Sequence, residues 1–111
     1  MKIRQYKQGV VTVLEPEEPI LDAGVAAMER VLDECIEAGD QKIVVDMGKV
    51  AFVESAGLET LVTRAARLTE RGGALKIANP SEICREVLRV TRLGRVLEVY
   101  ESTGEARKSF L

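Results

Sequence analysis

Short β-branched runs alternate along this chain with amphipathic helical stretches, and this alternation constrains the fold more than any other feature. The clearest run, Ile43–Val45, is wholly apolar, as is typical of a strand buried on both faces of a parallel sheet. Helical patterns flank it at residues 22–38 and from Ser55 to Gly73. Strand–helix–strand repeats are joined by right-handed crossovers, so the pattern predicts an α/β fold.

The remaining patterns complete this fold. Further strands are predicted at residues 2–6, 10–14, 74–78 and 96–100, and further helices at 79–94 and 103–110. Asp22 and Asn79 are expected to cap the first and third helices, and Glu15–Pro19 to form an exposed loop. The first two strands are expected to pair as a hairpin, which adds an antiparallel pair. We therefore predict a single domain over residues 1–111, with a mixed, mostly parallel sheet of four to five strands and packed helices.

The composition suits an intracellular protein without a cofactor. About half of the 111 residues (46%) are hydrophobic, which is enough for a core. Cys35 and Cys84 lie within helical patterns and lack metal-site spacing, so we expect buried free thiols in a reducing compartment. No window approaches the ~20 apolar residues of a membrane span, and no apolar signal follows Met1. We therefore expect a cytoplasmic protein with no membrane association.

Several classes of activity are disfavoured by the residues themselves. Histidine is absent, which removes the commonest general base and the commonest zinc ligand. Ser55 and Gly57 partly fit the hydrolase pattern Gly-x-Ser-x-Gly, but Val53 stands at its first glycine position. Residues 55–111 hold 10 basic and 7 acidic side chains, a bias too mild for a nucleic-acid binder. We therefore expect a binding protein, not an enzyme, with no metal and no direct nucleic-acid partner.

The most informative stretch joins the buried strand that ends at Asp46 to the helix that opens at Ser55. Open α/β sheets place their sites at the carboxyl ends of such strands. Ala56 and Gly57 are expected to leave the backbone around Ser55 open to another protein or an anion, and a phosphate on Ser55 would lie at the positive end of a helix. The pattern leaves two interpretations of Ser55: a phosphoacceptor or a helix-capping residue.

Charged residues around this stretch are further candidates. Asp46 is expected either to satisfy amides of the loop before Ser55 or to help place a nucleotide's metal ion during phosphorylation. Arg85, Arg89 and Arg92 form a stripe that is either a solvated face or a docking face for an acidic partner. A partner is expected to contact the start of the helix, with rim residues further out; this predicted surface comprises Glu54, Ser55, Ala56, Gly57, Arg64 and Arg85.

One run carries a family signature: Asp46-x-x-x-Val50-x-Phe52-Val53-Glu54-Ser55-Ala56-Gly57-Leu58. It resembles the STAS domain of bacterial anti-sigma factor antagonists, and the resemblance covers roughly residues 8–102. It implies a protein that binds an anti-sigma factor with serine kinase activity and thereby frees a sigma factor. The kinase would phosphorylate Ser55 and switch the antagonist off, and a phosphatase would reverse the change.

The chain departs from the family pattern at two places. Glu54 stands where the family usually carries aspartate, and Glu15–Pro19 replaces the usual apolar-Gly-acidic run. A second hypothesis therefore remains: a STAS scaffold or sensor subunit of a larger assembly, such as a stressosome-like or lipid-transport complex, without phosphorylation at Ser55.

Overall fold

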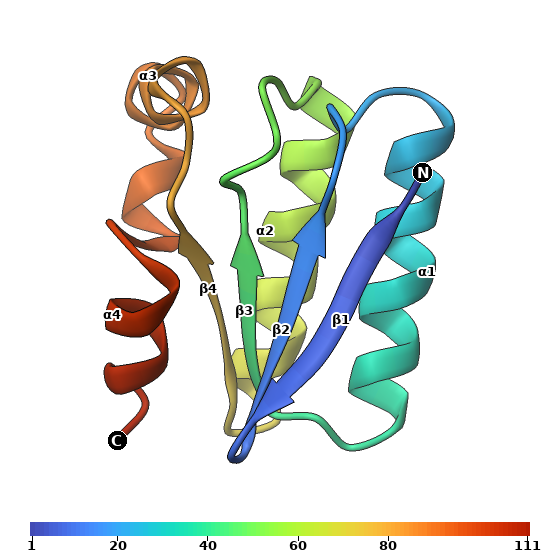
Figure 1. Ribbon diagram of the computed structural model, residues 1–111, viewed down its shortest axis with the longest axis vertical. Coiled ribbons are helices and arrows are strands. Elements are labelled where there is room, and N and C mark those ends of the chain that lie inside the picture. The colour runs from blue at the N-terminus through green and yellow to red at the C-terminus, as the bar shows by residue number, and fades with distance from the viewer.

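Five strands form one mixed sheet in the computed structural model, which describes residues 1–111, and their spatial order follows the chain (Figure 1). The strands are β1 (Ile3–Gln8), β2 (Val11–Pro16), β3 (Lys42–Asp46), β4 (Ala74–Ala78) and β5 (Glu98–Tyr100). β1 and β2 pair antiparallel, and every later pair is parallel. The predicted α/β fold with a mixed, mostly parallel sheet is confirmed.

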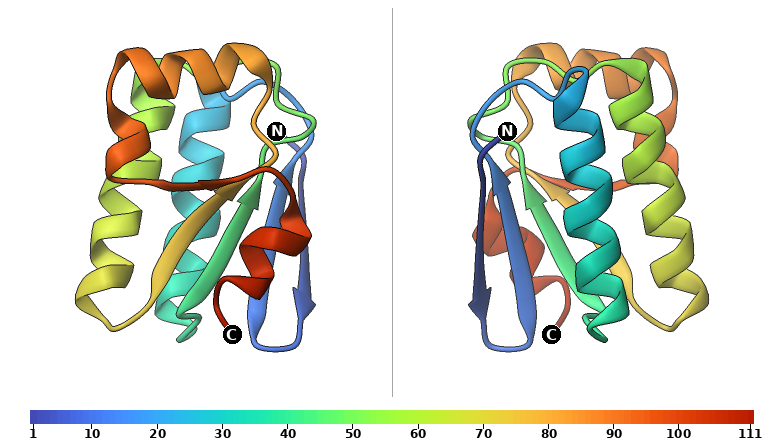
Figure 2. Two further views of the ribbon diagram at one scale, coloured as in Figure 1. Left: turned by 90° about the vertical axis from the view of Figure 1, so that its left-hand side faces the viewer. Right: turned by 90° about the vertical axis from the view of Figure 1, so that its right-hand side faces the viewer.

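The helices are arranged on both faces and at one end of this sheet. They are α1 (Ala23–Glu37), α2 (Ser55–Glu70), α3 (Glu82–Val90) and α4 (Thr103–Lys108), with the 3-10 turn η1 (Leu93–Arg95) after α3. α1 and α2 lie side by side on one face, α4 covers the other, and α3 lies across the carboxyl ends of the parallel strands (Figure 2). None of these helices combines the length and the apolarity needed to cross a bilayer.

The sheet separates two cores of unequal size. A cluster of 21 buried residues fills the side that α1 and α2 cover, with Ile43 and Val45 of β3 among them. A cluster of five, which includes Val44 and Ala106, lies beneath α4. Successive side chains of a strand point to opposite faces, so the apolar run of β3 supplies both cores at once.

The structure differs from the sequence prediction mainly at the ends of elements. Asp22 precedes α1 but its side chain makes no cap hydrogen bond, and Asn79 does not cap α3. The backbone N–H of Asn79 donates to the Tyr100 carbonyl, which keeps Asn79 beside the sheet. The helix consequently begins later, and Ser81 caps it by accepting a hydrogen bond from the Cys84 amide at 3.1 Å. Pro16, expected in a loop, is buried at the end of β2.

Candidate functional site

A short parallel bridge fixes the backbone directly before Ser55. The amide of Ile20 donates to the Phe52 carbonyl at 2.9 Å, and the amide of Glu54 donates to the Ile20 carbonyl at 3.1 Å. The loop that leaves β3 is thereby tied to the loop that leaves β2, immediately before α2 begins. These two hydrogen bonds therefore fix the backbone that leads into Ser55, at the carboxyl end of the sheet.

Ser55 differs from the other serines in what its hydroxyl does. Glu54 occupies the N-cap position of α2, so Ser55 is the first helical residue; it is exposed, and its hydroxyl makes no hydrogen bond. The interpretation of Ser55 as a helix cap is wrong. The hydroxyls of Ser81 and Ser102 cap helices, and that of Ser109 contacts the Lys76 ammonium at 2.7 Å. Ser55 is thus the serine with an accessible, unengaged hydroxyl.

The two small residues that follow Ser55 have different environments. Ala56 is exposed, but Gly57 is buried. A Cβ at Gly57 would lie 2.8 Å from Cγ1 of Val53 and 3.1 Å from Cγ2 of Ile20. The expectation that Gly57 leaves the helix start open to a partner is therefore wrong, because its missing side chain lets α2 pack against the bridged loops.

A groove runs along α2 from Ser55. It has a volume of about 220 Å³ and lies between α2 and the turn after α3; its lining residues are Ser55, Leu58, Glu59, Val62, Thr91 and Leu93. Large apolar side chains are also exposed on the neighbouring loops and on the first turn of α3, namely Leu21, Phe52 and Ile83. The sequence did not predict this apolar surface, because periodicity gives no sign that an isolated loop residue such as Leu21 or Phe52 stays exposed.

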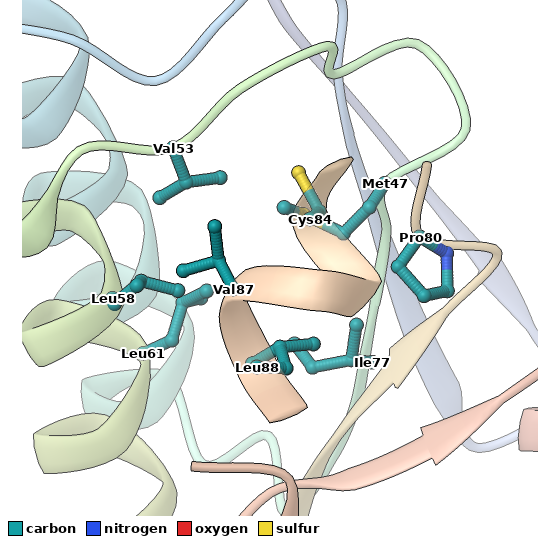
Figure 3. A pocket seen from close by; sticks show the side chains of 9 residues that line it. All are labelled: Met47, Val53, Leu58, Leu61, Ile77, Pro80, Cys84, Val87 and Leu88. Carbon is teal, nitrogen blue, oxygen red and sulfur yellow. The ribbon is translucent and has the colours of Figure 1, made fainter. Parts of the chain in front are cut away.

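A second, closed hollow lies beneath α3 (Figure 3). Its volume is about 10 Å³, roughly that of one water molecule, so it is a packing gap and cannot hold a larger ligand. The residues that line it are Met47, Val53, Leu58, Leu61, Ile77, Pro80, Cys84, Val87 and Leu88.

Cys84 here and Cys35 in α1 are buried free thiols, as expected, and burial raises the pKa of Cys35 to about 11.

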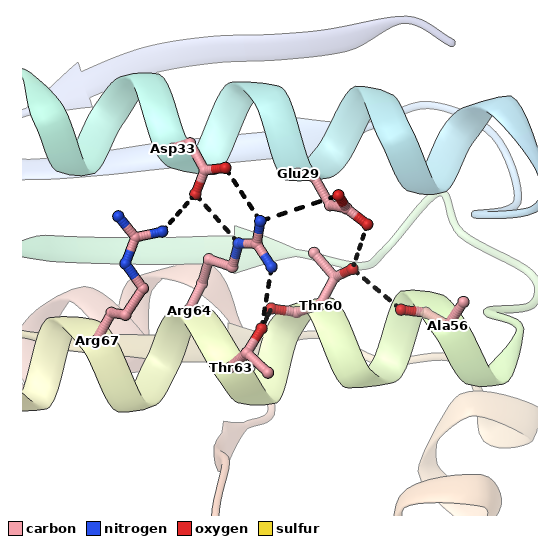
Figure 4. A network of polar contacts seen from close by, with 7 residues as sticks. All are labelled: Glu29, Asp33, Ala56, Thr60, Thr63, Arg64 and Arg67. Carbon is pink, nitrogen blue, oxygen red and sulfur yellow. Dashed lines mark hydrogen bonds and ion pairs between the residues drawn. The ribbon is translucent and has the colours of Figure 1, made fainter.

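A polar network joins α1 to α2 (Figure 4). The Arg64 guanidinium donates from Nε and Nη2 to the two carboxylate oxygens of Asp33, at 3.1 and 3.0 Å, and Arg67 donates to Asp33 at 2.7 Å. Nearer Ser55, the Thr60 hydroxyl lies 3.0 Å from the Ala56 carbonyl and 3.3 Å from Glu29. Arg64 shares a shallow hollow with Ala56, but its guanidinium is engaged by Asp33.

This network yields a prediction about stability in acid. Hydrogen bonds and charge from Arg64 and Arg67 hold the pKa of Asp33 below its usual value of 3.8. Because the pKa of Asp33 is lower in the folded chain than in the unfolded chain, its ionised carboxylate stabilises the fold at any pH above the unfolded-state pKa. This stabilisation is lost as the pH falls through the lowered, folded-state pKa. Asp33→Asn should therefore cost about 1 kcal/mol at pH 7, a figure kept small because the pair is partly solvated.

Urea unfolding of wild type and Asp33→Asn between about pH 7 and pH 2 tests this. The two stabilities should converge in acid. Glu86→Gln, which removes the charge of a fully exposed ion pair with Arg89, serves as the control and should change little. A difference between wild type and Asp33→Asn that stays constant down to the lowest pH would contradict the assignment.

The remaining predicted site residues, Asp46 and Arg85, are engaged elsewhere. Asp46 is buried at the end of β3, where one carboxylate oxygen accepts from the Gly48 amide at 2.9 Å and the other from the Thr103 hydroxyl at 3.0 Å. It thus shapes the first part of the loop that leads to Ser55. Arg85 lies on α3 in a bidentate pair with Glu101, at 3.1 and 3.3 Å, and lines no hollow with Ser55.

The architecture is shared with proteins already described. The family model of the STAS domain matches residues 2–106, nearly the whole chain. The chain belongs to the STAS domain family. A Bordetella bronchiseptica relative named "Putative anti-sigma factor antagonist BtrV" is 27% identical over 103 residues, which cover 93% of this chain and 81% of that protein.

Two solved structures show the same STAS fold. TM1081 from Thermotoga maritima superimposes with a TM-score of 0.91 at 23% identity, covering 96% of this chain and 92% of that one. The anti-sigma factor antagonist SpoIIAA in its unphosphorylated form gives a TM-score of 0.84 at 18% identity, covering 98% and 96%. This STAS domain thus resembles "Putative anti-sigma factor antagonist BtrV" in sequence and shares its fold with SpoIIAA.

Proposed function

We propose that this STAS domain is a cytoplasmic anti-sigma factor antagonist that is switched by phosphorylation of Ser55. It binds an anti-sigma factor with serine kinase activity while Ser55 is unmodified, and a phosphatase restores that state. The chain is a substrate of the kinase and catalyses no reaction. The observation that carries the proposal is the Ser55 hydroxyl, which is exposed and unbonded at the start of α2.

The surroundings of Ser55 favour recognition by a protein. The groove beside it is lined in part by Val62 and Leu93, which are partly exposed, and Phe52 exposes 42% of its surface on the adjoining loop. Apolar side chains grouped on an exposed face are typical of protein interfaces. A partner that covers these side chains would also cover the Ser55 hydroxyl, so a charge placed there would act directly on the interface.

The fold itself is compatible with such a modification. SpoIIAA, which shares the STAS fold, has been solved in both unphosphorylated and phosphorylated forms. A phosphoserine adds about −1.5 to −2 charge at neutral pH. At Ser55 this charge would gain roughly 0.3–1 kcal/mol from the helix N-terminus, and repulsion from Glu54 would offset a similar amount. The domain should therefore remain folded when modified.

Phosphate mapping tests the proposal. Incubation of the chain with its cognate kinase and ATP, followed by mass spectrometry, should place phosphate on Ser55 and leave Ser55→Ala unmodified. The hydroxyls of Ser81, Ser102 and Ser109 are already engaged in hydrogen bonds within the fold, so they should be poor acceptors.

Phosphate found mainly on Ser81 or Ser102 would contradict the proposal. A chain that the kinase binds but never phosphorylates would instead favour the scaffold or sensor subunit of a larger assembly.

A further inference from the structure

A second charged surface lies where α3 ends. Residues 85–95 hold four arginines and one glutamate, and the structure divides these arginines into two groups. Arg85 pairs with Glu101, and Arg89 pairs with Glu86 on its own helix. Arg92 and Arg95 are exposed and have no carboxylate within ion-pair distance. The stripe that the spacing predicted is thus neutralised at Arg85 and Arg89. The unpaired positive charge lies at Arg92 and Arg95.

Arg92 and Arg95 face an open hollow of about 340 Å³, called here the arginine hollow; its lining residues are Leu88, Arg89, Arg92, Gly94 and Arg95. The turn after α3 separates it from the groove at Ser55, because Thr91 and Leu93 line that groove while the alternate residues line the hollow. The arginine hollow and the Ser55 groove are therefore neighbouring but distinct surfaces.

The backbone at Arg92 is unusual. Arg92 follows the C-cap of α3 with φ 63° and ψ 13°, in the left-handed region. Glycine is the common residue there, because a Cβ in that conformation is strained. The Arg92 side chain makes no hydrogen bond or ion pair that would compensate within the domain. The left-handed backbone ends α3, a role that glycine would fill, so the turn itself does not require an arginine side chain here.

We propose that the arginine hollow is a docking surface for a carboxylate-rich segment of a protein partner. The planar guanidinium forks of Arg92 and Arg95, which have no ion-pair partner, match carboxylates in bidentate geometry. The groove next to it, lined in part by the partly exposed Val62 and Leu93, suits a segment that carries apolar residues beside its acidic ones.

Other polyanions fit this surface less well. The hollow has no aromatic side chain on which a base could stack, and the chain has a net charge of −2, so nucleic acid is disfavoured. Anionic membranes are bound by clusters of about four to eight basic residues, more than the two unpaired arginines here. A protein segment of opposite charge remains, and it would be steered by long-range attraction that salt weakens.

The test uses the full ¹⁵N-labelled chain and a short poly-glutamate peptide as the probe. Amide shifts should be confined to residues 88–95. Arg95→Glu should weaken binding by roughly tenfold or more, because it replaces an attraction by a repulsion. Arg30→Glu makes the same change of charge at an exposed arginine of α1 that has no ion pair, so it should leave the affinity nearly unchanged.

Arg92→Gly separates docking from a merely structural role. It should weaken peptide binding several-fold while the melting temperature stays constant or rises by a few degrees, because strain is relieved. A lower melting temperature, equal weakening by Arg30→Glu, or a response to inorganic phosphate or phosphatidylserine vesicles but not to the peptide would each overturn the proposal. No kinase and no change at Ser55 is involved, so its failure would leave the phosphorylation switch standing.

Discussion

Replacing Gly73 by alanine is expected to lower the free energy of unfolding by roughly 3 kcal/mol or more, the cost of a severe overpacking. A Cβ at Gly73 would lie 2.1 Å from the carbonyl oxygen of Gln41 and 2.9 Å from its Cα. That oxygen accepts a hydrogen bond from the Ala74 amide at 2.8 Å, where β3 and β4 begin to pair. The backbone at Gln41 cannot move away from the added Cβ without disturbing the pairing of β3 with β4.

The adjacent glycine is a matched control. Gly72 has φ +82°, and a Cβ there would meet nothing within 4 Å. Gly72→Ala should therefore cost only the strain of a left-handed alanine, about 1–2 kcal/mol. Urea unfolding of both variants measures the difference, and a Gly73→Ala protein that is no less stable than Gly72→Ala would show that the two chain segments do not approach as described.

Substitutions at Ser55 are expected to separate partner binding from folding. Ser55 is exposed and unbonded, so neither Ser55→Ala nor Ser55→Asp removes a contact within the domain, and both should melt within a few degrees of wild type. Ser55→Asp places a carboxylate beneath a covering partner, where it loses water. We expect it to bind the anti-sigma factor on the order of a hundredfold more weakly, a loss of about 3 kcal/mol.

Ser55→Ala should bind the anti-sigma factor as well as wild type does and should no longer be switched off by the kinase. Titration calorimetry of both variants, beside thermal melts, measures these effects. Equal affinities of the alanine and aspartate variants would contradict the mechanism, as would a Ser55→Asp protein that fails to fold.

The sequence was sufficient to predict the order of the elements, because their patterns are strong and local. The apolar run Ile43–Val45 and the glycines that follow α2 each place an element within a residue or two. Caps were less predictable. Asn79 has the residue type of a cap, but its backbone N–H donates to the carbonyl of Tyr100 in β5. This contact joins segments that are distant in sequence, so local pattern could not reveal it.

The candidate site was predictable only in part for the same reason. Ser55 was found because its motif is contiguous, whereas the role of Gly57 depends on Ile20, which a crossover brings to it. The sequence also could not predict which arginines form ion pairs. Spacing treats Arg85 and Arg92 alike, yet Glu101 from the end of β5 neutralises only Arg85.

Phosphate on Ser55 is proposed to alter recognition by the anti-sigma factor and to leave the fold nearly untouched. The most direct test compares the dissociation constant of the anti-sigma factor for the wild-type chain before and after stoichiometric phosphorylation at Ser55, with a thermal melt of each form. Binding should weaken by about two orders of magnitude while the melting temperature hardly moves. An unchanged dissociation constant, or a phosphorylated chain that has lost its fold, would contradict it.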